Sequence, residues 1–248
     1  MLVENRPGAS GTLALGALAR AAPDGHTLVF AAVSSAALLA RGGAGPARSV
    51  AALPVAGVMR TPVLVAGTPA LGTRGFEAML ALARQRPGAL RWATTGEGTT
   101  GYTVLDRVRR LAGVDIAHVP YKGGGRQLLD ALGGQFEVLS TNVAAQQLRE
   151  IGAGRLTALA VGAPQRLTAL PRTPTLAELG FAPANLDSLF GLFAPQGLSA
   201  PLVERLHAEI TAVVGEDALR AKLLQMNNTP YTGSPGDFAR AVRDLVHR

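Results

Sequence analysis

The sequence contains no cysteine, so it forms no disulfide or thiolate metal site and offers no cysteine nucleophile. Aromatic residues are also scarce, at 4% of the chain with a single tryptophan, and the basic residues are dispersed singly or in pairs. Nucleic-acid-binding proteins need aromatic stacking platforms or a continuous track of basic residues. We therefore expect no nucleic-acid partner.

Long apolar runs are absent as well. The two longest stretches without a charged residue, Gly25 to Ala40 and Ser188 to Val203, hold 16 residues each, whereas a helix that crosses a bilayer needs about 20 apolar residues. The first seven residues contain no basic segment followed by an apolar core, so the chain as given shows no secretion signal. We expect neither stretch to cross a membrane.

The sequence does contain enough apolar material for a buried core. Of its 248 residues, 48% are apolar and 17% are charged, which is typical of globular proteins and not of disordered chains. The 24 lysine and arginine residues exceed the 17 acidic residues and give a net charge of +7. A positive net charge favours anionic partners through long-range attraction.

Short apolar runs rich in β-branched residues alternate with segments of helical periodicity. This alternation predicts parallel strands joined by crossover helices, and therefore an α/β fold. Helices are predicted where apolar residues recur every three or four positions, at Phe76 to Ala83, Val104 to Ala112 and Val203 to Val213, and after Ser234. The predicted strands are Thr27 to Val33, Val63 to Ala66, Leu90 to Thr94, Ile116 to Val119, Phe136 to Ser140, Leu156 to Val161 and Leu189 to Ala194.

A G-x-G-x-x-G pattern, Gly96 to Gly101, lies between the predicted strand Leu90 to Thr94 and a helix that begins near Thr99. Glycines allow backbone amides to approach a ligand, and the unpaired N–H groups at a helix N-terminus attract anions. Three interpretations stay open: a small-anion site, a structural turn, and a dinucleotide site of an NAD(P)-dependent oxidoreductase. The last needs a carboxylate at the end of the following strand, and Asp115 stands at the beginning of that strand instead.

A second glycine-rich loop, Pro120 to Gly125, also joins a predicted strand to a helix, and it is either a structural connection or a ligand loop. Small polar residues follow two more of the predicted strands. In open parallel sheets, ligands gather beyond the carboxyl ends of the strands, so we expect these residues and the two loops to share one rim. The candidate ligand contacts are Ser34, Ser35, Gly96, Gly98, Thr99, Thr100, Tyr121, Lys122, Gly123, Thr141 and Asn142.

Catalytic and metal-binding motifs are missing from the sequence. The four histidines, His26, His118, His207 and His247, are scattered without carboxylates at metal-ligand spacing, and there is neither a nucleophile elbow nor a P-loop. We therefore expect no metal site.

Several segments together match a known family in their order along the chain, although no single one is specific. They are Val3 to Ala9, Ala22 to Leu28, Val119 to Gly123, Leu132 to Gln135, Ala153 to Val161, Pro171 to Thr175 and Phe190 to Pro195. With these segments the chain resembles the tricarboxylate-transport receptors of the Bug family, which are periplasmic solute-binding proteins of bacteria. The resemblance covers nearly the whole chain.

The resemblance implies a two-lobed α/β fold of the type II periplasmic-binding-protein kind, with parallel-sheet lobes joined by crossover strands at Pro62 to Gly67 and Leu189 to Ala194. The first lobe would comprise residues 1–66 and 190–248, and the second lobe residues 67–189. The resemblance further implies a periplasmic, monomeric receptor that is not an enzyme and has no cofactor. It would hold a small carboxylate in the cleft between the lobes and present it to a membrane transporter or sensor.

Members of that family have a first strand and a first helix before the segment that matches Val3 to Ala9. The resemblance therefore implies that the first strand and helix of the first lobe are missing from the chain as given. A lobe without that strand would have open sheet edges, which natural proteins normally avoid. A truncated remnant that binds nothing, and the oxidoreductase, stay open as alternatives to the receptor.

Overall fold

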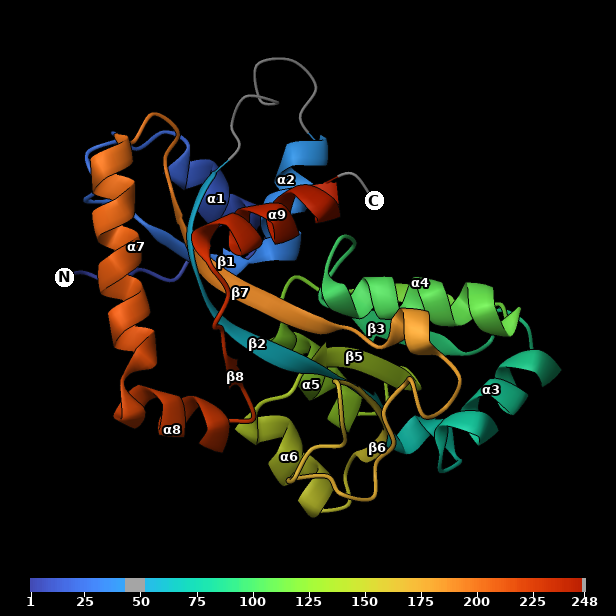
Figure 1. Ribbon diagram of the computed structural model, residues 1–248. Coiled ribbons are helices and arrows are strands. Elements are labelled where there is room, and N and C mark those ends of the chain that lie inside the picture. Colours follow the sequence, from blue (N-terminus) through green and yellow to red (C-terminus); the bar gives the residue numbers. More distant parts are fainter. Residues whose placement is uncertain (43–51, 247–248) are drawn as a thin grey trace. The chain divides into compact units, whose positions relative to one another are not determined.

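The computed structural model describes residues 1–42 and 52–246 and divides into two compact units (Figure 1). Unit 1 is Met1–Thr61 with Ser188–Arg248, and unit 2 is Pro62–Asp187. Two strands, β2 (Leu53–Gly67) and β7 (Asp187–Ala194), contain the boundaries. From the sequence we expected the boundaries to follow residues 66 and 189, within the same two segments.

Unit 1 is built on antiparallel strand pairs. Strand β1 (Val29–Ala32) pairs antiparallel with β7, and the short strand β8 (Thr229–Pro230) pairs antiparallel with the first half of β2. The prediction of parallel strands was wrong for β1 and β7, and β8 was not predicted. Strand direction is not encoded in the periodicity of a short apolar run, so the alternation of strands and helices could not reveal it.

The helices of unit 1 come from both ends of the chain. Figure 1 shows α9, in red, lying against α2, in blue, and the two helices are in contact. The core of the unit buries Leu15, Leu18, Phe193 and Phe238 completely or almost completely. The helical elements are η1 (Ala9–Gly11), α1 (Thr12–Leu18), α2 (Val33–Gly42), α7 (Ala200–Gly215), α8 (Asp217–Gln225) and α9 (Pro235–Val246).

Unit 2 contains a mixed sheet in the order β6, second half of β2, β5, β3 and β4. Strands β3, β4 and β5 are parallel, as predicted, whereas β2 is antiparallel to both β5 and β6, which corrects the prediction of an all-parallel sheet. The bounds are β3 (Arg91–Thr94), β4 (Ala117–Pro120), β5 (Val138–Asn142) and β6 (Thr157–Gly162).

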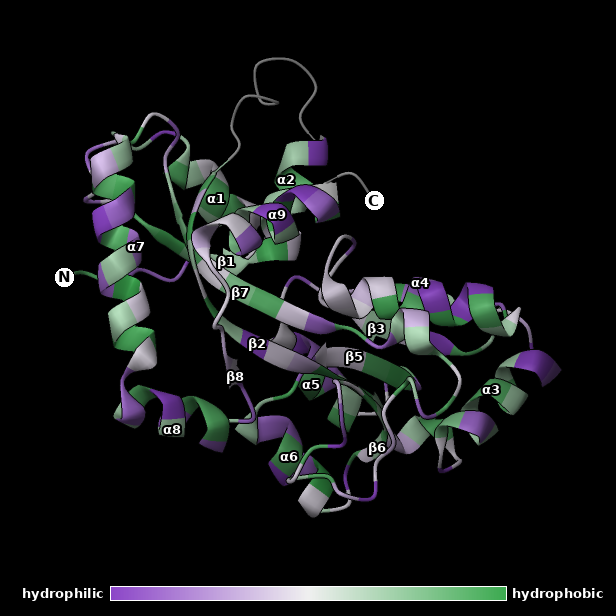
Figure 2. Ribbon diagram, viewed as in Figure 1, coloured by the Kyte–Doolittle hydropathy of each residue, from purple (hydrophilic) through white to green (hydrophobic). Residues whose placement is uncertain are grey.

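Helices cover both faces of this sheet. Successive residues of β2 point to opposite faces, so the strand contributes side chains to two cores. Val63 and Val65 belong to one core with residues of α3 and α4, and Leu64 and Ala66 belong to another with residues of α5. Figure 2 shows apolar and polar residues alternating around the turns of α4, as its periodicity predicted. The helices are η3 (Pro69–Leu71), α3 (Phe76–Gln85), α4 (Thr100–Ala112), α5 (Gly124–Leu132), α6 (Ala145–Gly152) and η4 (Ala182–Ala184).

Across residues 1–42 and 52–246, no helix combines the length and the apolar character that crossing a membrane requires.

Candidate functional site

The parallel strands β3, β4 and β5 end at the same edge of the sheet of unit 2. We call this the carboxyl edge and define it as residues 95–100 after β3, 121–125 after β4, and 141–142 at the end of β5. Nine of the eleven candidate contacts are in these segments, all of them within unit 2. The two remaining candidates, Ser34 and Ser35, belong to unit 1.

The loop after β3 is shaped by two glycines with left-handed backbone angles, Gly96 (φ 117°) and Gly98 (φ 81°). The N–H of Gly96 donates to the Thr94 hydroxyl at 3.1 Å, so it is not free for a ligand. The Thr99 hydroxyl donates to the Gly96 carbonyl at 2.8 Å and accepts the N–H of Tyr102 at 3.3 Å, which caps α4. Within the described chain, the N–H groups of Gly98 and Thr100 have no acceptor.

The last glycine of the G-x-G-x-x-G pattern has a packing role. A Cβ on Gly101 would lie 3.0 Å from the Ser140 hydroxyl and 3.1 Å from the Ser140 carbonyl oxygen. The Ser140 hydroxyl donates to the Gly101 carbonyl at 2.8 Å and accepts the indole N–H of Trp92 at 3.0 Å. These bonds hold the first turn of α4 against β5. Neither Ser140 nor Trp92 was a candidate, because no sequence pattern links residues so far apart.

A dinucleotide site would need a carboxylate at the end of β4 to bind the ribose, and the structure places none there. Asp115 precedes β4 and therefore lies at the opposite edge of the sheet from the Gly96 to Gly101 loop. Its carboxylate is 3.8 Å from the Arg109 guanidinium. Strand β4 ends at Pro120, followed by Tyr121, and neither residue carries a carboxylate.

Helix α5 begins without a side-chain cap, because its N-cap residue is Gly123. The first-turn N–H groups of such a helix carry partial positive charge and are available to an anion. Beside them lies Thr141, which is only 9% exposed and whose hydroxyl bonds to no described residue. A Cβ placed on Gly124 would be 4.0 Å from the Thr141 Oγ1. The hydroxyl and the α5 amides can therefore reach one small ligand together.

The side chain of Tyr121 is hydrogen-bonded within unit 2, whereas that of Lys122 is exposed and unpaired among the described residues. The Tyr121 hydroxyl donates to the Asp130 carboxylate at 3.0 Å, and its N–H donates to the Thr94 carbonyl at 2.9 Å. Burial and the hydrogen bond to Asp130 raise the pKa of Tyr121. Its side chain is thus used within unit 2. The Lys122 side chain is exposed and pairs with no other described residue, so its positive charge is free to attract an anion.

In unit 1, Ser34 and Ser35 lie in the first turn of α2 rather than in a loop. The Ser35 hydroxyl is buried and donates to the Ser10 carbonyl at 2.6 Å. Ser34 is half-buried, and its hydroxyl bonds to no residue that the structure describes. Of this pair, only Ser34 has a free hydroxyl.

A buried glutamine that sequence reasoning missed also supports the carboxyl edge. Gln127 on α5 is 1% exposed, and its Nε2 donates to the carbonyls of Ala93 at 3.0 Å and Ser140 at 3.2 Å. These bonds tie the ends of β3 and β5 to α5. The only sign of this role in the sequence was the position of Gln127, a polar residue directly before the apolar Leu128.

His118 on β4 is hydrogen-bonded to the same threonine that holds the Gly96 amide. Its Nε2 lies 2.8 Å from the Thr94 hydroxyl, and its ring is 4.8 Å from that of Tyr102. The Thr94 hydroxyl oxygen accepts the Gly96 N–H, so the proton of that hydroxyl can be donated to Nε2 of a neutral His118 ring. Burial lowers the pKa of His118 below its usual 6.5, the charge of Glu97 opposes this, and Arg109 adds to it.

This lowered pKa predicts that acid destabilises the protein through His118. Between the folded and unfolded pKa values the unfolded state binds more protons, so the free energy of unfolding falls as the pH drops below about 6.5. Urea unfolding at pH 7.5 and 5.5 measures the effect, and His118→Gln should reduce it. An identical pH dependence in the variant would contradict the assignment. Carboxylates such as Glu137, with a pKa below 4.5, contribute only in stronger acid.

Comparisons with known proteins find relatives along the whole chain. Residues 1–248 match the family described as tripartite tricarboxylate transporter family receptor. Protein BugT of Bordetella pertussis is 30% identical over 253 residues, covering 100% of this chain and 77% of BugT. The structure titled R. palustris Rpa4515 with adipate is 29% identical with a TM-score of 0.88, covering 100% of this chain and 83% of that one. MatC from Rhodopseudomonas palustris with bound malate is 26% identical with a TM-score of 0.84, covering 97% and 83%.

Proposed function

Because this chain belongs to the family of tripartite tricarboxylate transporter receptors and has their two-lobed α/β fold, we propose that it is a monomeric, periplasmic solute-binding receptor and not an enzyme. Its ligand is a small carboxylate, held at the carboxyl edge of unit 2. The receptor presents this ligand to a membrane transporter or sensor.

One observation carries the proposal of the ligand site. The Thr141 hydroxyl is nearly buried and bonds to no described residue, and it lies beside the uncapped first turn of α5. A hydroxyl donor and several backbone N–H donors around one point match the oxygens of a carboxylate. The free amides of Gly98 and Thr100, the exposed Lys122 and the net charge of +7 favour an anion further.

The class of carboxylate is narrowed by two relatives. Their structures are described with adipate and with malate, which are both dicarboxylates. Around the carboxyl edge of this chain, the donors are mostly amides and hydroxyls, which accept a range of carboxylates. We therefore place dicarboxylates first among its ligands.

A thermal-shift screen with mono-, di- and tricarboxylates tests the proposal directly. Binding to the folded state alone raises the unfolding midpoint in proportion to occupancy, so a hit needs no assumed chemistry. A dicarboxylate should give the largest rise. The absence of any rise with the whole panel would contradict the proposal.

For a ligand found this way, Thr141→Val should weaken binding by roughly tenfold to a hundredfold, because a hydrogen bond to a charged group contributes about 1.5–3 kcal/mol. Valine keeps the shape of threonine, so the fold should be unchanged. Isothermal titration calorimetry of both proteins measures the ratio of dissociation constants.

The matched control is Thr157→Val at the start of β6. Gly67 on β2 pairs with both Thr157 and Val138, the first residue of β5, so Thr157 lies at the edge opposite to Thr141. This variant should bind as the wild type does. Equal affinity in Thr141→Val and in Thr157→Val would remove Thr141 from the site.

A further inference from the structure

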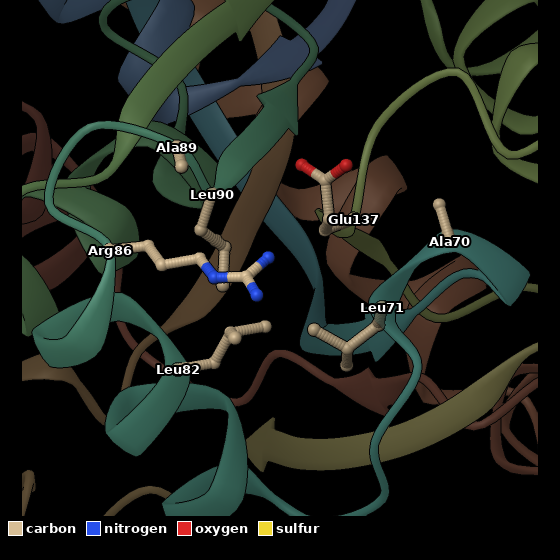
Figure 3. A pocket seen from close by; sticks show the side chains of 7 residues that line it. All are labelled: Ala70, Leu71, Leu82, Arg86, Ala89, Leu90 and Glu137. Atoms are coloured by element: carbon tan, nitrogen blue, oxygen red, sulfur yellow. The ribbon is translucent and has the colours of Figure 1, made fainter.

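A hollow opens at the other edge of the same sheet, where β3 and β5 begin (Figure 3). Its volume is about 240 Å³. Leu90 directly precedes β3 and Glu137 directly precedes β5, so the length of the strands separates this hollow from the carboxyl edge. A strand of four residues spans roughly 13 Å. The lining residues are Ala70, Leu71, Leu82, Arg86, Ala89, Leu90 and Glu137.

The acidic residue of the hollow is already neutralised. The Glu137 carboxylate accepts two bonds from the Arg91 guanidinium, at 2.6 and 3.1 Å, and one from the Arg91 N–H at 2.7 Å. Burial raises the pKa of Glu137, but the hydrogen bonds and charge of Arg91 outweigh it and hold this pKa below 4.5. Glu137 is therefore ionised and paired at neutral pH.

The basic residue of the hollow has no such partner. Arg86 makes no ion pair or hydrogen bond through its guanidinium with any residue in the described part of the chain. Figure 3 shows its side chain extending from the end of α3 into the hollow, while the Glu137 carboxylate points away from it. With Glu137 balanced by Arg91, the hollow keeps one uncompensated positive charge.

The remaining lining residues are all apolar. Leu71 and Leu90 are buried, and Leu82 is half-buried on α3. A carboxylate can form two parallel hydrogen bonds with a guanidinium, and an apolar group attached to it would cover the leucines. A hollow of this volume lies below the range of about 300–1,000 Å³ that is typical of drug-sized ligands. It therefore suits a single ring or a short branched chain.

From this geometry we propose a second ligand site, at Arg86, for a small monocarboxylate with a compact apolar body. The Arg86 guanidinium binds the carboxylate, and Leu71, Leu82 and Leu90 contact the apolar part. The site is independent of the carboxyl edge and of whichever ligand binds there.

Benzoate is a suitable probe, because it combines one carboxylate with one ring. Ligand-observed NMR with the full chain should detect its binding, and Arg86→Met should weaken that binding at least tenfold, since methionine keeps an apolar chain and removes the charge. Ala70→Phe should also abolish binding by filling the hollow from η3. Arg84→Met is the control, because Arg84 lies in the last turn of α3, is also exposed and does not line the hollow; this variant should leave binding unchanged.

Three outcomes would overturn this site: no benzoate binding at millimolar concentration, equal binding by the wild type and Arg86→Met, or loss of benzoate binding in Thr141→Val. The last result would place the probe at the carboxyl edge. Conversely, benzoate binding that needs Arg86 and tolerates Thr141→Val supports the second site, even if the dicarboxylate panel gives no hit.

Discussion

Replacing Thr99 by aspartate should weaken carboxylate binding at least a hundredfold while unit 2 stays folded. The Thr99 side chain caps α4 by accepting the Tyr102 N–H, and aspartate is among the best N-cap residues. The substitution therefore keeps the cap and adds a negative charge beside the free amides of Gly98 and Thr100. Like charges a few Å apart in a partly buried site cost several kcal/mol. Calorimetric titration with the ligand found by the screen measures the loss.

Thr99→Asn is the matched control, because asparagine caps a helix about as well as aspartate and carries no charge. It should lose no more than about tenfold in affinity. Both variants should unfold at nearly the same urea concentration as the wild type. If Thr99→Asp bound the ligand as tightly as Thr99→Asn does, the loop after β3 would lie outside the binding site.

Gly162→Ala should destabilise the protein by about 3 kcal/mol, at the upper end of the usual cost of overpacking. Gly162 is the last residue of β6, and a Cβ there would lie 2.0 Å from the Leu186 carbonyl oxygen. The residues next to this pair, Asn185 and Ala163, are joined by two hydrogen bonds between the Asn185 side chain and the Ala163 backbone, at 2.8 and 3.3 Å. The backbone around Leu186 therefore has little freedom to move away. Urea denaturation followed by circular dichroism measures the change.

The control for this prediction is Gly152→Ala at the end of α6, where a Cβ would meet no atom within 4 Å. Alanine is favoured over glycine in a helix by up to about 1 kcal/mol, so this variant should be as stable as the wild type or slightly more stable. A loss below about 1 kcal/mol in Gly162→Ala would show that the Leu186 segment adjusts easily.

The sequence predicted the places of the strands better than their directions or lengths. All seven predicted strands exist, and six of them match the observed bounds within two residues at each end, because each is a short apolar run between helical segments. Strand β2 is much longer than predicted, since Pro54 and Pro62 fall inside it and prolines are expected to interrupt a strand. Its antiparallel pairing depends on contacts between distant residues, which no local pattern records.

At the carboxyl edge, the residues that support the loops were harder to predict than the loops themselves. Glycine spacing and helix starts located the segments after β3 and β4. The bond from the Ser140 hydroxyl to the Gly101 carbonyl joins residues 39 positions apart, so it depends on three-dimensional packing that no local pattern records. That any of the eleven candidate residues contacts a ligand stays a prediction.

The bond between the Trp92 indole and Ser140 gives the protein an optical probe of its own. Trp92 is the only tryptophan, it is fully buried, and its N–H reaches the hydroxyl that holds the first turn of α4. Its fluorescence therefore carries no background from other indoles. A shift in its emission wavelength reports directly whether that turn is seated on β5, without any attached dye.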